Sequence, residues 1–241
     1  QEVGYQVRFD KKLTKETKLQ IVTEGILTKR IQQDPFIEEF DCVMLDEFHL
    51  RSIHGDLALA FLKEIQNTVR PDLKILVTSA TLEAEPVSSF LDKCAVIESK
   101  GRCYQLTINY ERLDKRQTPI KMEELAARRA QQAITNTKGH VLVFLPGARE
   151  IRNTLDILSY KVSQPVLPLH GSLSPEAQDR AIKPQEQSII LATNVAETSL
   201  TIDGVTAVVD SGYLRLPTFD AAIGLGRLEQ RRISKDSAEQ R

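Results

Sequence analysis

One pattern recurs seven times along the 241 residues: a short run of β-branched or other apolar residues ends in polar or small ones. The seven stretches are LQIVTEG, CVMLDEFH, KILVTSAT, VLVFLPG, PVLPLHG, SIILATNVAET and AVVDSG. Runs too apolar to alternate are typical of strands buried on both faces of a parallel sheet. The stretches between them carry helical spacing, and residues 55–69 place on one face Leu57, Ala60, Phe61 and Ile65. Alternating strands and helices predict an α/β fold with parallel sheets.

The alternation breaks over residues 99–119, where an extended run is followed by charged residues and a proline. We interpret this stretch as a crossing between two α/β units. We expect a first unit over residues 1–100, a crossing over residues 101–118 and a second unit over residues 119–241. The tail predicts a β-hairpin around Gly224, over about residues 213–233. A (β/α)₈ barrel is the structural alternative, but the irregular middle stretch and the hairpin-like tail count against it.

Composition narrows the function classes. The 32 basic and 33 acidic side chains nearly cancel to a net charge of -1, so a nucleic-acid surface would have to be a local patch. The three cysteines have no metal-ligand spacing, and their odd number argues against a disulfide framework, which favours the cytoplasm. No apolar run approaches membrane-spanning length, so no membrane association is expected.

Two adjacent acids follow the apolar run CVML. Asp46 and Glu47 would emerge at the carboxyl end of a strand, where open α/β sheets bind their ligands. Such a pair suits a division of labour in which one acid holds Mg²⁺ through water and the other deprotonates an attacking water. The alternative is a capping role at the start of the following helix. His49 has no zinc-type spacing to another histidine, so a hydrogen-bonding role is favoured.

Polar clusters also close other apolar runs. Ser79 and Thr81 follow KILV, where a hydroxyl can bond a neighbouring acid or cap the next helix. The segment 191–212 carries more hydroxyl, amide and carboxylate groups than one turn needs, among them Thr193, Asn194 and Asp203. Donors of this kind suit the phosphate oxygens of a nucleotide or of a nucleic-acid backbone.

Taken in order, four motifs resemble the series of superfamily 2 helicases, and specifically the DEAH-box class. They are TEG at 23–25, DEFH at 46–49, SAT at 79–81 and TNVAETSLTIDG at 193–204. Their contexts DEFHLRSIHGDLALAFL, ILVTSATLE and LVFLPGAREI look most like the bacterial HrpB type of ATP-dependent RNA helicase. The resemblance covers essentially the whole chain. It implies two RecA-like domains, the first truncated at its N-terminus, with a hairpin near the C-terminus.

The resemblance also implies roles on the nucleotide side, with ATP or another NTP and Mg²⁺ as cofactors. Asp46 corresponds to the acid that coordinates Mg²⁺ through water, and Glu47 to the base that activates the hydrolytic water. Asp203 corresponds to a position on the side of the bound nucleotide, and Gln240 matches a residue that positions the hydrolytic water. His49 resembles the residue that couples the nucleotide site to the second domain.

The remaining implied roles concern coupling and RNA. Ser79 and Thr81 are the expected partners of His49 in coupling. Thr23, Thr193 and Asn194 correspond to positions near the backbone of a bound strand, expected to be single-stranded RNA, with DNA as an open alternative.

Two departures from the family pattern shape the expected activity. None of the 11 glycines is followed by lysine, so these residues contain no GxxxxGK[ST] phosphate-binding loop. Of the last family motif, QRxGRxGR, only Gln240 and Arg241 are present. We therefore expect an excised piece of an NTP-driven helicase that hydrolyses little or no ATP alone. The alternatives are a non-catalytic nucleic-acid-binding module and a barrel-type metal hydrolase using Asp46, His49 and His170.

Overall fold

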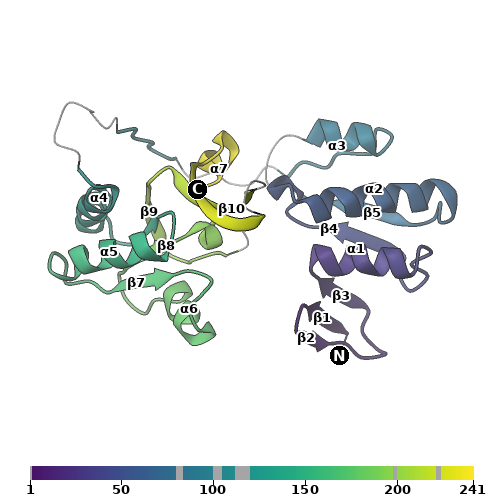
Figure 1. The fold of residues 1–241 in the computed structure, drawn as a ribbon, viewed down its shortest axis with the longest axis horizontal. Helices are drawn as coiled ribbons and strands as arrows, with labels where there is room; N and C mark the ends of the chain where they lie inside the picture. The colour runs from purple at the N-terminus through teal and green to yellow at the C-terminus, as the bar shows by residue number, and fades with distance from the viewer. Residues whose placement is uncertain (1, 80–83, 100–104, 112–119, 198–199, 221–223) are drawn as a thin grey trace. The chain divides into compact units, whose positions relative to one another are not determined.

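The computed structural model describes residues 2–79, 84–99, 105–111, 120–197, 200–220 and 224–241. The chain divides into two compact units, Gln1–Tyr104 and Gln105–Arg241 (Figure 1). The division falls within the segment expected to cross between units. Among the residues with predicted roles, Thr81 lies outside the described ranges.

Unit 1 contains two small sheets with helices between and after their strands. Its elements are β1 (Val3–Val7), β2 (Asp10–Lys12), β3 (Leu19–Val22), α1 (Glu24–Gln33), β4 (Cys42–Leu45), η1 (Phe48–Leu50), α2 (Ile53–Thr68), β5 (Lys74–Val77) and α3 (Ala84–Phe90). Strand β1 pairs antiparallel with β2 and parallel with β3, while β4 and β5 form a parallel pair. The parallel pairing places the ends of β4 and β5 at one edge, so the residues that follow them are neighbours.

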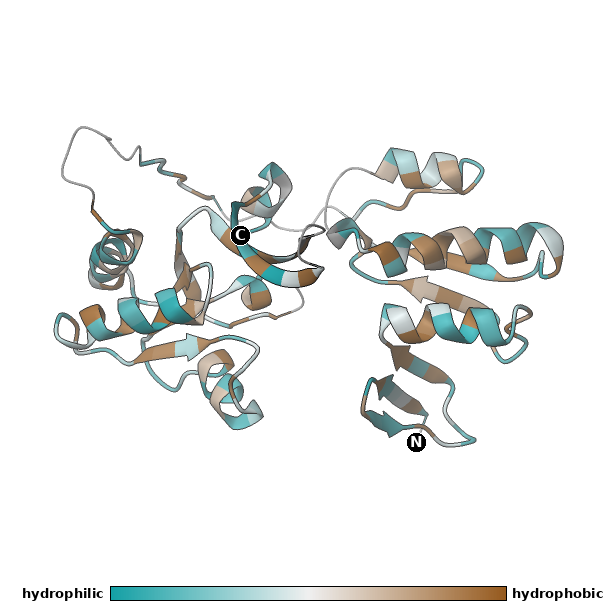
Figure 2. Cartoon of the chain, in the orientation of Figure 1, coloured by the Kyte–Doolittle hydropathy of each residue, from teal (hydrophilic) through white to brown (hydrophobic). Residues whose placement is uncertain are grey.

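The core of unit 1 lies between α2 and one face of β4. Helix α2 packs through Ala58, Leu59, Leu62 and Ile65. Of the predicted apolar face, Ile65 is buried and Phe61 packs against the core, but Leu57 and Ala60 are exposed, so the prediction was wrong at these two positions. Figure 2 shows that both apolar and polar residues occur along this helix. The expectation that every run is buried on both faces was also wrong here. The register partners Met44 and Leu76 are 52% and 49% exposed, because they lie on the face of the pair opposite the core.

Unit 2 is built on a four-stranded parallel sheet of order β7-β8-β6-β9. Its elements are α4 (Met122–Asn136), β6 (His140–Phe144), α5 (Ala148–Ser159), β7 (Val166–Leu169), α6 (Pro175–Ile182), β8 (Ile189–Ala192), η2 (Asn194–Ala196), β9 (Val205–Asp210), β10 (Tyr213–Asp220), β11 (Leu225–Arg232) and α7 (Lys235–Gln240). Strand β8 is fully buried, and alternate residues of β6 and β8 belong to separate cores on the two faces. Helices α4 and α5 cover one face and α6 contributes to the other. The predicted α/β fold with parallel sheets is confirmed, and the single-barrel alternative was wrong.

The predicted hairpin is confirmed as β10 and β11, which pair antiparallel from Tyr213 opposite Arg232 to Asp220 opposite Leu225. Gly224, just before β11, has φ of +66°, a conformation that glycine adopts without the steric cost a Cβ imposes. No helix within the described residues is both long and apolar enough to span a membrane.

Candidate functional site

Asp46 is held at the carboxyl edge of the β4–β5 pair by the residue that follows the neighbouring strand. Leu45 pairs with Val77, so Thr78 lies directly beside Asp46. The Thr78 hydroxyl donates to Asp46 Oδ1, which also accepts the Glu47 backbone N–H at 3.1 Å. Both bonds use Oδ1, and Oδ2 has no hydrogen-bond partner among the described residues. The carboxylate is thus fixed in direction while one oxygen remains exposed.

Thr78 was missed by the sequence reasoning, which selected Ser79 and Thr81 from the same stretch. Thr78 also accepts the Glu47 N–H through its hydroxyl at 3.3 Å and the Phe48 N–H through its carbonyl at 3.0 Å. The register of the two parallel strands was the signal that could have found it, because the first residue after each strand must be a neighbour.

Glu47 has a left-handed backbone, with φ of 53° and ψ of 38°, at the start of η1. A non-glycine residue in this region costs about 1–3 kcal/mol, and such outliers cluster at functional sites. The His49 Nε2 lies 3.3 Å from Glu47 Oε2, and the imidazole side chain is only 5% exposed against 34% for the glutamate. One partner of His49 is therefore the predicted base itself, and its predicted coupling to Ser79 stays a prediction.

The predicted RNA-backbone residue Thr23 lies at the N-cap of α1, close in the fold to the loop after DEFH. Its hydroxyl makes no capping bond, while its carbonyl accepts the N–H groups of Ile26 and Leu27. The adjacent Glu24 accepts a hydrogen bond from the Ser52 hydroxyl, and Ser52 also caps α2. This contact brings the TEG and DEFH loops together on one side of unit 1.

Unit 2 has a cavity of about 310 Å³ at the carboxyl edge of its sheet. It brings together the two predicted backbone residues, Thr193 and Asn194, with groups that sequence reasoning did not assign to this role. The further lining residues are Pro146, Gly147, Ala148, Arg149, His170, Gly171, Ser172, Arg215 and Leu228. Thr193 is fixed by its N–H bond to the Leu169 carbonyl at 3.1 Å.

Two arginines, Arg149 and Arg215, and the imidazole of His170 line the cavity. Arg215 reaches from β10 to the first turn of α5, where its Nη2 donates to Glu150 Oε1 at 2.9 Å. The His170 Nδ1 lies 2.9 Å from the Ser172 hydroxyl, which orients the ring. A Cβ at Gly147 would approach Glu150 Oε2 to 3.1 Å and Arg215 to 3.3 Å, so glycine permits this close packing.

Asp203 does not join this cluster. It is exposed in the turn before β9, and the neighbouring Gly204 carbonyl accepts the N–H of His140, the first residue of β6. Since β8 and β9 run parallel to β6, Asp203 lies at the amino edge of the sheet and Thr193 at the carboxyl edge. Its predicted place on the nucleotide side stays a prediction.

Gln240, the predicted water-positioning residue, is the last residue of α7. The next residue, Arg241, contacts the carboxyl edge of the sheet. The Arg241 side chain is 2% exposed and lies over the Phe144 ring at 4.6 Å. Its Nε donates to Glu197 Oε2 at 2.8 Å and its Nη1 to Asp210 Oδ1 at 3.0 Å. Its Nη2 lies 2.6 Å from the same Glu197 oxygen, an ion-pair contact without hydrogen-bond alignment.

Glu197 also accepts a hydrogen bond from the Ser237 hydroxyl of α7. The carboxyl ends of β6, β8 and β9 therefore meet the C-terminal turn of α7 in one charge cluster of Glu197, Asp210 and Arg241. Sequence reasoning missed this cluster, although both acids stand in the quoted strand-end motifs.

Comparison with known proteins places the chain among helicases. Residues 120–232 match the family described as "Helicase conserved C-terminal domain". The chain is 40% identical over 244 residues to the ATP-dependent RNA helicase HrpB of Escherichia coli, a match that covers 99% of this chain and 30% of the relative. It is 36% identical to the probable ATP-dependent RNA helicase DHX34 of Homo sapiens, covering all of this chain and 22% of the relative.

A solved structure, that of the E. coli DEAH/RHA helicase HrpB, matches with a TM-score of 0.88 and 39% identity over 99% of this chain and 31% of that chain. The α/β, RecA-like fold of the chain and its C-terminal domain match are those found in helicases. Along nearly its full length the chain is similar to helicases of the DEAH-box class, as its resemblance to the HrpB type predicted. It spans less than a third of the length of these relatives.

Proposed function

We propose that this chain is the part of an ATP-dependent RNA helicase that carries the magnesium-binding acid, the water-activating acid and part of the RNA path. The observation that carries the proposal is the fixed Asp46–Thr78–Glu47–His49 arrangement in unit 1. It occurs in a chain related along nearly its full length to proteins named as ATP-dependent RNA helicases. The expected location is the cytoplasm.

The Asp46 carboxylate fits Mg²⁺ in the way nucleotide enzymes use it. Mg²⁺ keeps several waters and takes one or two carboxylates plus substrate phosphates, so a single oriented acid is a suitable donor. Among the described residues no group of three or more acid, histidine or cysteine side chains could form a metal cage. When bound, the ion would neutralise charge on the phosphate oxygens of ATP. Thr78 orients Asp46 for this role through its hydroxyl.

Glu47 is the proposed general base. Its carboxylate is partly exposed, so a water can reach it, while His49 contacts one of its oxygens from the buried side. This contact and the left-handed backbone fix the direction of the carboxylate before a water binds. A positioned base contributes about 10²–10⁴-fold to a hydrolytic rate.

In unit 2 the cavity around Thr193 and Asn194 is the proposed site for the backbone of a single-stranded RNA. Hydroxyl and amide groups beside two arginines suit phosphate and sugar oxygens, which take most contacts in such complexes. Thr23 is the proposed backbone contact of unit 1.

Binding of a fluorescein-labelled single-stranded oligoribonucleotide to the purified chain tests this proposal. Fluorescence anisotropy should report saturable binding that weakens as salt rises, because phosphate contacts release counterions. Asn194→Ala should weaken binding about 2- to 12-fold, the effect of one hydrogen bond. Asn153→Ala on α5, outside the cavity, is the matched control. Equal affinities for wild type and Asn194→Ala would remove Asn194 from the site, and tighter binding of the matching DNA would favour the DNA-helicase alternative.

The 241-residue chain alone is expected to turn over little or no ATP even with saturating RNA. The phosphate-binding loop and the later arginines of the last motif are not among these residues, and such groups supply most of the transition-state charge stabilisation. A coupled-enzyme ATPase assay checks this. RNA-stimulated turnover that Glu47→Gln abolishes would contradict it.

A further inference from the structure

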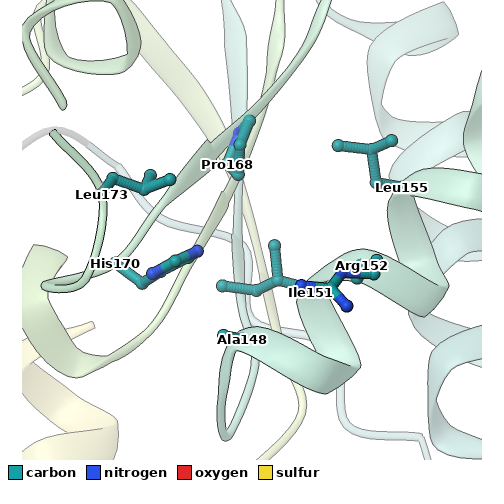
Figure 3. Close-up of a pocket in the computed structure, with 7 residues that line it drawn as sticks. All are labelled: Ala148, Ile151, Arg152, Leu155, Pro168, His170 and Leu173. Atoms are coloured by element: carbon teal, nitrogen blue, oxygen red, sulfur yellow. The ribbon is translucent and has the colours of Figure 1, made fainter. Parts of the chain in front are cut away.

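A second cavity in unit 2, of about 200 Å³, adjoins the proposed RNA-backbone site. It lies between α5 and the end of β7, and its lining residues are Ala148, Ile151, Arg152, Leu155, Pro168, His170 and Leu173. In Figure 3 the α5 side chains face His170 and Leu173, with Pro168 between the two groups. The lining is almost entirely apolar, whereas the adjoining cavity has a larger share of polar surface.

The two cavities share Ala148 and His170. A strand whose phosphates lie beside Thr193 and Asn194 would therefore have the apolar cavity within reach of its bases. Sites for single-stranded nucleic acids combine these two parts, a positively charged groove for the backbone and a surface on which bases stack. The shared position of His170 links the two parts.

The walls of this cavity suit a flat ring. RNA bases stack on aromatic rings, including histidine, and on arginine guanidinium planes, and the cavity offers both in His170 and Arg152. Ser172 fixes the imidazole orientation through Nδ1, so the ring does not have to be ordered when a base arrives. Ile151, 1% exposed, and Pro168 provide apolar contact deeper in the site.

Size limits the occupant. The volume lies below the roughly 300–1,000 Å³ typical of pockets for drug-sized ligands, so a single base fits the space better than a whole nucleotide. We propose that this cavity is a base-stacking subsite that receives one unpaired base of the RNA whose backbone lies in the adjoining cavity. The proposal rests on the RNA-binding function proposed above and adds a base contact to it.

An abasic scan tests the subsite directly. A short oligoribonucleotide with one abasic position, moved stepwise along the strand, is titrated against the chain by fluorescence anisotropy. One position should lose about 5- to 150-fold in affinity, the range that base stacking contributes. His170→Ala should remove most of this sensitivity, whereas His170→Phe, which keeps a flat ring, should retain it.

Leu173→Trp fills the cavity from the wall opposite α5 without removing a group that lines the adjoining cavity, and it should also remove the abasic sensitivity. Arg152→Ala, which removes the guanidinium from the cavity lining, should also lower the abasic sensitivity, and Arg180→Ala on α6, outside both cavities, is its matched control. Circular dichroism identifies any variant that fails to fold.

The outcomes separate the two proposals. Binding of intact RNA with no abasic position that matters, or with the same sensitivity in Leu173→Trp, overturns the subsite and leaves the proposed RNA binding in place. In that case a protein side chain becomes the better candidate occupant. Failure of the folded chain to bind intact RNA overturns both.

Discussion

Replacing Arg241 by methionine should selectively destabilise the carboxyl edge of the unit 2 sheet. Methionine keeps much of the apolar contact over Phe144 but leaves Glu197 and Asp210 without their cation. The two acids are only 11% and 24% exposed, so water compensates little. Removing one partner of a buried ion pair typically costs 3–5 kcal/mol, and we expect about 3 kcal/mol here because Asp210 retains the Gly212 N–H.

The chain has two units, so a single unfolding transition cannot be assumed, and hydrogen exchange with mass spectrometry is the suitable assay. Peptides covering β8 and β9 should lose protection in Arg241→Met, while peptides of unit 1 should not change. The matched control is Arg129→Met, whose pair with Glu111 is about 40% exposed and should contribute at most about 1 kcal/mol.

A triple variant tests whether the unpaired charges of Glu197 and Asp210 cause the loss of protection. Combining Arg241→Met with Glu197→Gln and Asp210→Asn removes all three charges, and much of the lost protection should return because no buried charge remains unpaired. Equal, small effects of Arg241→Met and Arg129→Met would refute the reasoning that this cluster holds α7 to the sheet.

The remaining predictions concern smaller contacts. Thr78→Val should reduce exchange protection at the β4–β5 edge by about 1–3 kcal/mol, because Asp46 and the Glu47 N–H lose a hydrogen-bond partner. Thr78→Ser, which keeps the hydroxyl, should restore the protection. Unchanged protection in Thr78→Val would contradict the role of this hydroxyl. The Arg129 guanidinium holds the pKa of Glu111 below its usual value, so the pair's contribution is complete above about pH 4.3 and is lost as pH falls through the lower folded value. An NMR titration should find the pKa of Glu111 below that of an ordinary glutamate, and in Arg129→Met this pKa should be higher than in the wild type. The same pKa in both proteins would argue against the pair.

The polar residues that follow the strands were largely predictable from the sequence, because an apolar run followed by polar residues indicates where a strand ends and a loop begins. Asp46, Thr193 and Asn194 indeed stand directly after strands or at the start of the next turn. Sequence periodicity did not reveal which polar residue contacts which. Thr78 instead of Ser79 holds the acid because of strand register, a property of the pairing.

Burial in unit 1 was predicted less well for a related reason. An apolar run indicates that a strand can be covered on both faces, but coverage depends on what packs there. Met44 and Leu76 are exposed because the core of unit 1 lies on the other face of the β4–β5 pair. The contact between His49 and Glu47 depends on a left-handed backbone at a non-glycine residue, which sequence patterns do not signal.

The central proposal is that this chain supplies the water-activating acid and an RNA path to an ATP-driven helicase. The most direct measurement replaces the matched segment of E. coli HrpB by this chain and compares RNA-stimulated ATP hydrolysis with and without Glu47→Gln. The account predicts RNA-stimulated turnover in the chimera and a loss of at least about 100-fold in the variant, the contribution of a general base. A folded, RNA-binding chimera that hydrolyses ATP equally fast with glutamine at this position would contradict it.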